Sequence, residues 1–472
     1  MITITKNKYK KISFNADFRK SNADKRRFFL ETICDNPREI RDHLRSNKIF
    51  RKLTKIGILS LGCPRNLVDS ESILGRLALK GYPIVDIDKA DVAIVNTCAF
   101  IKDAKVESID AILDLVELKK EGKLKKIIVY GCLPERYRDD LRKELPEVDA
   151  FIGRISLNHS FRRFAIIPKH YAYLKICEGC LNNCSFCIIP KIKGRFTSLD
   201  INSIFEKIDA FDKAKISEVN IIGQDITTYG IDLYGRIKLT EILESIVKRI
   251  KNIGWIRLLY LHPDRLTDEL LHLIKDSQKI CKYIDLPIQH INNRILKLMS
   301  RKTKKSDILK LIDKIRRVIP AVTLRTSIIV GFPSETEKEF KELLRFIEDA
   351  RFERLGAFIY SREEGTDAFS FEKQIPKEIK LERFNAIMSC QKNISEEINK
   401  NFLGRIIDVL VEEKYSTSIS KSEIYLGRSQ YDAPEVDGLV YVNSKRKLAP
   451  GDFVKVRITD TLEYDLVGKA QE

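Results

Sequence analysis

The chain has 472 residues, which is too long for one ordinary hydrophobic core, so we expect about two to four domains. Its 43% hydrophobic and 32% charged residues exclude a disordered or fibrous class and are typical of a globular protein. No run of about 18 apolar residues occurs and the first residues contain no apolar core, so neither a membrane span nor a secretory signal is expected. Ten cysteines in this length do not indicate a disulfide scaffold, which favours a reducing, cytoplasmic location.

The net charge of +18 is concentrated near the N-terminus. Residues 1–55 hold sixteen Lys and Arg against six Asp and Glu, and their apolar spacing predicts a basic extension that is partly helical. Such a charge favours a polyanionic partner, with RNA or a ribosome as the natural candidate, but a solvated tail explains it equally well. The lone Cys34 in this extension is expected to be structural or incidental.

Three cysteines stand close together in the stretch CLNNCSFC, at Cys180, Cys184 and Cys187. The stretch follows an apolar run, residues 171–176, that predicts a strand. Three thiolates at this spacing can hold three irons of a [4Fe–4S] cluster, so that the fourth iron stays open to a small molecule. An open metal position is typical of a catalytic site, whereas structural sites are usually fully ligated. A zinc knot or unrelated buried thiols are the alternatives.

An alternation of strands and helices begins near residue 55. Runs rich in Val and Ile, separated by helices, predict a parallel sheet covered on both faces. The predicted elements are strands at 56–61, 90–95 and 126–130 and helices at 66–80 and 104–120. A cysteine follows each strand, at Cys63, Cys98 and Cys132. Because the carboxyl ends of parallel strands share one edge, these thiols should converge and hold a second cluster with one open iron, unless they are only small buried hydrophobes.

The β/α rhythm continues beyond the cysteine loop and predicts an incomplete barrel of six β/α units, (β/α)6, open on one side. Its strands are expected at 171–176, 218–222, 255–260, 283–286, 324–330 and 354–360, and its reactive face at their carboxyl ends. Helices are expected at 306–317, 335–350 and 377–402. From residue 404 on, short strands at 406–411, 422–426, 439–442 and 453–458 with turns between them predict a small antiparallel β-barrel of OB-like size.

Several motifs extend these predictions to a family. LGCPRNLVDSE, NTCAFI and YGCLPERY resemble the N-terminal domain of the radical S-adenosylmethionine (SAM) methylthiotransferases, and HYAYLKICEGCLNNCSFCIIPKIKGR resembles their radical SAM core. The C-terminal segment resembles their TRAM domain. The resemblance implies an α/β chain with a basic extension at 1–53, an N-terminal methylthiotransferase domain at 54–165, a radical SAM core at 166–402 and a TRAM domain at 404–472.

The family implies a sulfur-group transferase with two [4Fe–4S] clusters and SAM as cofactors. The cluster on Cys180, Cys184 and Cys187 would cleave SAM to a radical that removes hydrogen from an unactivated carbon, a step that needs a cofactor. The other cluster would deliver sulfur, so the sheet edge should face the mouth of the barrel. The resemblance also gives candidates for holding SAM, namely Phe186, Gln224, Arg325, Ser327 and Gly331. Hydrogen bonding and packing in the barrel core is the alternative role for these residues.

Within the family, GCPRNLVDSE, PKHYAYLKI and QYDAPEVDG resemble the branch that acts on ribosomal protein S-twelve (uS12). This implies methylthiolation of the β-carbon of an aspartate, an electron donor such as flavodoxin or ferredoxin, and no membrane. The acids Asp432, Glu435 and Asp437 suit a basic ribosomal protein. The alternatives are methylthiolation of a modified adenosine in tRNA, with TRAM in contact with RNA, and a cluster-bearing regulator without turnover. Cys177 stands where the family has serine, and we expect it to stay outside the CxxxCxxC set.

Overall fold

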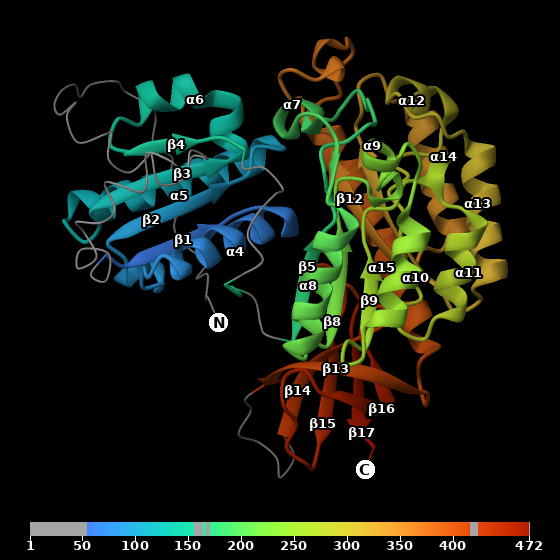
Figure 1. Cartoon of the computed structure of the whole chain (residues 1–472). Helices are drawn as coiled ribbons and strands as arrows, with labels where there is room; N and C mark the ends of the chain where they lie inside the picture. The colour runs from blue at the N-terminus through green and yellow to red at the C-terminus, as the bar shows by residue number, and fades with distance from the viewer. Residues whose placement is uncertain (1–53, 155–163, 167–169, 416–422, 472) are drawn as a thin grey trace. The chain divides into compact units, whose positions relative to one another are not determined.

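The computed structural model describes residues 54–154, 164–166, 170–415 and 423–471 (Figure 1). The predicted basic extension at 1–53, with Cys34, lies outside the described residues. The other predicted regions fall within them, apart from the gaps just given.

The N-terminal region is a four-stranded parallel sheet in the order β1-β2-β3-β4, with helices packed against it. Its elements are β1 (Ile56–Ser60), α4 (Pro64–Leu79), η1 (Ile87–Lys89), β2 (Val92–Thr97), α5 (Lys102–Lys120), β3 (Lys126–Gly131), α6 (Cys132–Glu144) and β4 (Ala150–Ile152). The central strands are buried almost throughout, which is what their Val/Ile composition predicts. The predicted parallel sheet is confirmed, and the three-residue β4 is an addition.

Six parallel strands form the central barrel, in two sheets of order β5-β8-β9 and β10-β11-β12 that are joined by a bridge between Ile256 and Ile280. The strands are β5 (Tyr171–Lys175), β8 (Glu218–Ile222), β9 (Trp255–Leu258), β10 (Tyr283–Asp285), β11 (Thr323–Val330) and β12 (Arg354–Ile359). No pairing joins β5 to β12 among the described residues, so the barrel is incomplete, as predicted. Below, the carboxyl ends of these strands are called the mouth and their amino ends the base.

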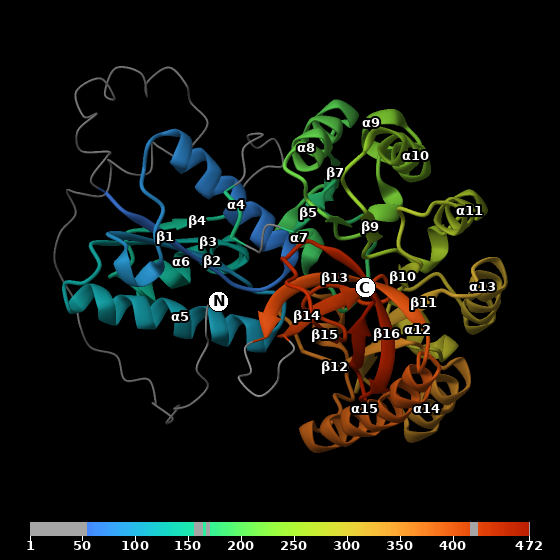
Figure 2. The same cartoon turned by 90° about the horizontal axis from the view of Figure 1, so that it is seen from below.

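Helices cover the outside of the strands, as the view from below shows (Figure 2). The longer ones are α8 (Ile201–Lys213), α10 (Leu239–Arg249), α11 (Asp268–Asp276), α13 (Lys305–Val318) and α14 (Glu337–Ala350). The shorter elements are β6 (Cys177–Glu178), α7 (Ile189–Lys193), β7 (Thr197–Ser198), η2 (Ile226–Thr228), α9 (Ile231–Tyr234), η3 (Pro263–Arg265), α12 (Asn293–Leu298) and η4 (Asp367–Ser370). Helix α14 begins with a capping box in which Thr336 and Glu339 satisfy each other's backbone N–H groups, so its start is encoded locally.

Successive side chains of a strand point to opposite faces, so the buried residues of the barrel form two cores, one between the strands and the outer helices and one inside the barrel. On β5, Leu174 packs with the helices outside, whereas Tyr171 and Tyr173 belong to a cluster on the inner face. That inner cluster also contains Val68 of α4 and Ala433 of the C-terminal region. The barrel interior is therefore filled in part by side chains from both flanking regions.

The C-terminal region is a closed five-stranded barrel in the order β13-β14-β15-β17-β16. Its strands are β13 (Ile406–Tyr415), β14 (Glu423–Ser429), β15 (Val440–Ser444), β16 (Phe453–Thr461) and β17 (Leu466–Ala470). The predicted small barrel is confirmed, but β17 was not predicted, and its pairing with β15 is parallel rather than antiparallel. That pairing closes the barrel and removes its open edges.

Helix α15 (Lys377–Lys400) connects the central barrel to the C-terminal one. It is the longest helix in the described residues, and its charged side chains are spread along its whole length. None of the helices that the structure describes has the length and apolar character needed to cross a membrane.

Candidate metal centres

Cys63, Cys98 and Cys132 lie at one edge of the N-terminal sheet, as predicted. Cys63 precedes α4, Cys98 follows β2, and Cys132 begins α6 directly after β3. The side chain of Asn66, almost fully buried, links their three loops. Its amide nitrogen donates to Leu61 O (3.0 Å) and Thr97 O (3.2 Å), and its amide oxygen lies 4.0 Å from the Cys132 thiol. Residues that are far apart in sequence are thus held in one place.

The backbone also brings the first two cysteines close together. Gly62 has a positive φ of 86°, and a Cβ atom there would lie 2.7 Å from the Cβ of Cys98. Only glycine allows this approach of the two loops.

The three thiols of the N-terminal edge differ in acidity. Burial raises the pKa of Cys98, and it raises the pKa of Cys132 to about 12. For Cys63, burial acts in the same direction, but the charge of Arg65 and a backbone N–H bond from Asn66 outweigh it, so the pKa is lowered. Iron binding requires thiolates, and Cys63 is the thiol of this set best prepared to supply one.

Cys180, Cys184 and Cys187 lie in the loop between β6 and α7, beside the mouth of the barrel. The Asn182 backbone N–H donates to the Cys180 sulfur at 3.4 Å. Arg301 donates to the Cys184 sulfur at 3.7 Å. Burial raises the pKa of Cys187 to about 12. Donors aimed at sulfur suit thiolates, since they stabilise negative charge there.

All six cysteines are free thiols. Within the described residues, no three His, Cys, Asp or Glu side chains are grouped so that they could hold one metal ion. A [4Fe–4S] cluster with one open iron needs three thiolates that each bind a different iron, and each set supplies three free thiols. The donor chemistry of both sets fits the clusters that the sequence predicts.

The N-terminal sheet edge contacts the mouth of the barrel, as expected. Arg65, on the first turn of α4, donates to Gly223 O just beyond β8 (2.9 Å), and its guanidinium carbon lies 4.4 Å from the centre of the Tyr260 ring just beyond β9. Lys105 and Arg136, from α5 and α6, both pair with the buried Glu363 at 2.8 and 3.1 Å.

Four buried charges between α4 and the barrel strengthen this junction. Lys175 pairs with Asp69 and, at 2.8 Å, with Glu178, and Lys193 pairs with Glu178 at 2.8 Å. Burial would raise the pKa of Glu178, but the two lysines lower it to about 2, so the carboxylate stays charged. A fully satisfied buried network of this kind rigidifies the contact between α4 and the barrel.

Of the residues predicted to hold SAM, Gln224 has the most suggestive surroundings. It follows β8 at the mouth, and among the described residues neither polar atom of its buried side-chain amide has a hydrogen-bond partner. Buried amides normally have partners, so this pair of free atoms is consistent with a ligand. Phe186 packs among apolar residues that include Met299 and Phe332.

The other three candidates have roles inside the protein. Arg325, on the inner face of β11, pairs with Asp285 at 3.1 Å and with Asp437 at 3.4 Å. The backbone carbonyl of Ser327 accepts a hydrogen bond from Gln289 N at 2.9 Å. Gly331 has a positive φ of 69° and donates its N–H to Glu335. Contact of these three with SAM stays a prediction.

Cys177 is fully buried and lies outside the CxxxCxxC loop. It lies on β6, and its thiol donates to Asp225 O at 3.6 Å. Burial raises its pKa well above the ordinary value. A neutral thiol with a protein partner suits packing.

The three acids of QYDAPEVDG are engaged within the chain, which corrects the argument that they await a basic protein. Asp432 pairs with Arg354, Tyr171 donates to Glu435 at 2.9 Å, and Tyr283 donates to Asp437 at 2.6 Å. Their partners belong to β12, β5 and β10, near the base of the barrel. The loop at 429–438 therefore docks the C-terminal barrel there, and its charge says little about the substrate.

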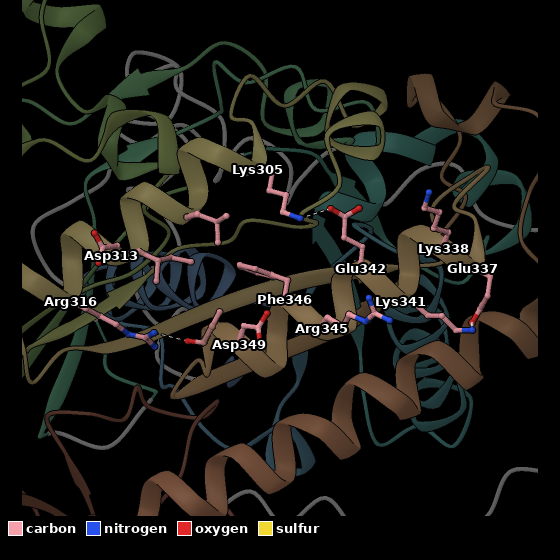
Figure 3. A pocket seen from close by; sticks show the side chains of 13 residues that line it. Lys305, Asp313, Arg316, Glu337, Lys338, Lys341, Glu342, Arg345, Phe346 and Asp349 are labelled. Atoms are coloured by element: carbon pink, nitrogen blue, oxygen red, sulfur yellow. Dashed lines mark hydrogen bonds and ion pairs between the residues drawn. The ribbon is translucent and has the colours of Figure 1, made fainter.

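A hollow of about 1020 Å³ lies on the helical outside of the central barrel, between α13 and α14. Figure 3 shows its lining, in which basic and acidic side chains alternate and Lys305 reaches Glu342. None of the predicted site residues lines it. Its mixed charge indicates a solvated groove between two helices rather than a reaction site.

Sequence reasoning missed several polar residues of the mouth. Asn66 and Arg65 stand beside Cys63 within a recognised motif, so their position was a usable signal. Arg301 had no comparable signal, because its contact with Cys184 spans 117 residues. Asn220, on β8, is fully buried and its amide has no partner among the described residues. It is a further candidate for contact with a ligand.

Comparison with known proteins gives three family matches along the chain. Residues 55–153 match Uncharacterized protein family UPF0004, residues 174–347 match the Radical SAM superfamily, and residues 403–470 match the TRAM domain.

Two similar curated proteins are each called ribosomal protein uS12 methylthiotransferase RimO. The one from Clostridioides difficile is 46% identical over 443 residues, covering 88% of this chain and 98% of the relative. The one from Caldanaerobacter subterraneus subsp. tengcongensis is 48% identical over 444 residues, covering 88% of this chain and 100% of the relative. Among solved structures, the radical SAM methyltransferase TsrM of Kitasatospora setae is similar with a TM-score of 0.49 and 12% identity, covering 78% of this chain and 79% of that one.

Proposed function

This chain belongs to the radical SAM methylthiotransferase family, in the branch of the uS12 methylthiotransferases named RimO, and from this we infer its reaction. The protein transfers a methylthio group to ribosomal protein uS12, at the β-carbon of an aspartate. The observation that carries this function is the identity of 46–48% with the two RimO proteins over 88% of the chain. The alternative in tRNA has no comparable support, because the matched relatives carry the ribosomal-protein name.

We propose Cys180, Cys184 and Cys187 as ligands of one [4Fe–4S] cluster and Cys63, Cys98 and Cys132 as ligands of the other. When bound, these groups supply the electron that cleaves SAM and the position from which sulfur is delivered. Asn66 holds the three loops of the second set, and the Arg65 contacts hold that set over the barrel mouth. The aromatic inner cluster excludes water from the barrel interior, where a reactive radical must not be quenched.

The radical SAM reaction also leads us to propose an electron donor, a protein partner and a cellular location. Cleavage of SAM needs a low-potential electron, so we propose flavodoxin or ferredoxin as the donor. Ribosomal protein uS12 is the partner that serves as substrate, and the TRAM barrel is a candidate contact for it or for nearby ribosomal RNA. A cytoplasmic location suits both partners and keeps the free thiols reduced.

Mass spectrometry of uS12 and of tRNA, from cells with and without this gene, tests the function. We expect one aspartate of uS12 to carry the added mass of a methylthio group, and the modification to disappear when the gene is deleted. Loss of a methylthio group from tRNA with no change in uS12 would overturn the proposal. Complementation with a variant in which Cys184 is alanine is the matched control, since it must fail to restore the modification.

A further inference from the structure

Arg65 is a cationic side chain that lies beside Cys63 and contacts the barrel mouth across the junction between the thiol sets. It lies two residues after Cys63, while its Nη1 donates to Gly223 O (2.9 Å) and its guanidinium covers the Tyr260 ring (4.4 Å) at the barrel mouth. Gly223 lies two residues before Asp225, which accepts a hydrogen bond from Asn182 of the CxxxCxxC loop at 2.8 Å. The charge of Arg65 is therefore held near both sets.

Among the residues that the structure describes, no carboxylate lies within ion-pair distance of Arg65, and the acidic groups that act on it are Cys63, Tyr260 and Cys132. Two other arginines of the mouth and interior differ in this respect, since Arg265 pairs with Asp225 and Arg325 pairs with Asp285. A partly buried charge needs a compensating one. The groups beside it that could carry the compensating negative charge are the Cys63 sulfur, two residues away, and, across the Gly223 contact, the CxxxCxxC loop.

We infer that Arg65 is a positioning residue shared by the two cluster sites, and that its charge stabilises the reduced, more negative state of both clusters. The inference rests on the proposed function only through the presence of the two clusters. The net charge around an iron–sulfur cluster is one of the factors that set its reduction potential. A cation held close to both sites raises both potentials.

Arg301 provides a matched comparison on the other side of the mouth. Its Nη1 lies 3.7 Å from the Cys184 sulfur and 2.8 Å from His262 Nε2, and its Nη2 donates to Pro287 O at 2.6 Å. It likewise has no carboxylate within ion-pair distance in the described part of the chain. Within the described ranges, no contact joins Arg301 to the N-terminal thiols, so its charge should affect one cluster only.

The experiment measures the midpoint potential of each cluster separately by redox titration followed by electron paramagnetic resonance. One background has Cys63, Cys98 and Cys132 replaced by alanine, and the other has Cys180, Cys184 and Cys187 replaced. Arg65→Met is introduced into both backgrounds. We expect the midpoint potential to shift to lower values in both, and Arg65→Lys, which keeps the charge, to give a smaller shift in each.

Arg301→Met is expected to lower the potential only in the background that keeps Cys180, Cys184 and Cys187. A shift by Arg65→Met in one background alone, or equal shifts by the methionine and lysine variants, would overturn the shared role. Iron content is measured on every sample, so that loss of a cluster is not mistaken for a shift. If the six cysteines hold no clusters at all, the proposed ligands fail instead, and the iron content alone reveals it.

Discussion

The mouth and the base of the central barrel are both closed by another part of the chain, yet they differ in how their polar groups are matched. At the base, Glu218 pairs with Arg257 at 2.8 Å and with Arg428 at 2.6 Å, all three fully buried. At the mouth, Arg65 has no carboxylate partner and the Gln224 amide no hydrogen-bond partner among the described residues.

This difference distinguishes a surface that holds two parts of the chain together from a site that binds ligands. A buried charge without a partner costs several kcal/mol, so a folded protein keeps such groups only where something else compensates them. The base, where charges are paired within the protein, is a docking surface. The mouth, where Arg65 has no carboxylate partner and the Gln224 amide no hydrogen-bond partner among the described residues, is prepared for ligands.

The largest effect is expected from the thiols of the mouth. Cys184→Ala should abolish both the release of 5′-deoxyadenosine from SAM and the methylthio product. Cys98→Ala should abolish the product but leave SAM cleavage, because its set is proposed to deliver sulfur rather than the radical. Product analysis by mass spectrometry and the iron content per chain, which should fall by about half in each variant, check this. A Cys98→Ala protein with full iron content would exclude Cys98 as a ligand.

At the base, we expect the loss of a buried charge to lower the stability of the protein. Glu218→Gln removes the charge shared by two buried arginines and should lower the free energy of unfolding by about 3–5 kcal/mol. Urea unfolding of the full chain measures this. Glu463→Gln is the control, because Glu463 pairs with Lys392 on the surface and should change stability by less than about 1 kcal/mol. If both variants unfold at the same urea concentration, the base does not depend on its buried charges.

The charge network at the mouth predicts a pH dependence. Lys175 and Lys193 lower the pKa of Glu178 to about 2, below its ordinary value of 4.5. A lowered pKa in the folded state gives stability that is present above pH 4.5 and is lost as the pH falls toward 2. The difference in unfolding free energy between the native protein and Glu178→Gln should thus be constant near neutral pH, at about 3 kcal/mol, and shrink in acid. A difference that grows in acid would contradict the assignment.

Much of the fold was predictable because it is encoded locally. The main Val/Ile strands of the two β/α regions and the helices α4, α5, α13 and α14 were predicted from the sequence, whereas α6, α8, α10 and α11 were not. That the cysteines after the first three strands share one edge follows from the parallel topology. The short strands β4 and β17 were missed, since three to five residues give little periodicity. The loop at 429–438 was misread because its acids look exposed in sequence, whereas their basic and phenolic partners lie 78 to 264 residues away. The lack of a carboxylate partner for Arg65 likewise depends on tertiary contacts, which the spacing of residues in the sequence does not reveal.

The smallest effect is expected at Glu435, on the loop that docks at the base. Glu435 is exposed, has a positive φ of 70°, and accepts one hydrogen bond from Tyr171 at 2.9 Å. Glu435→Ala loses that bond and keeps the unfavourable backbone conformation, so it should cost about 1 kcal/mol. Glu435→Gly loses the same bond, but glycine adopts positive φ without strain, so the two effects should nearly cancel, to within about 0.5 kcal/mol. Thermal unfolding of the two variants side by side measures the difference. Equal destabilisation by both would mean that the backbone at Glu435 is unstrained, and a loss as large as that of Glu218→Gln would mean that an exposed contact of the base matters as much as a buried one.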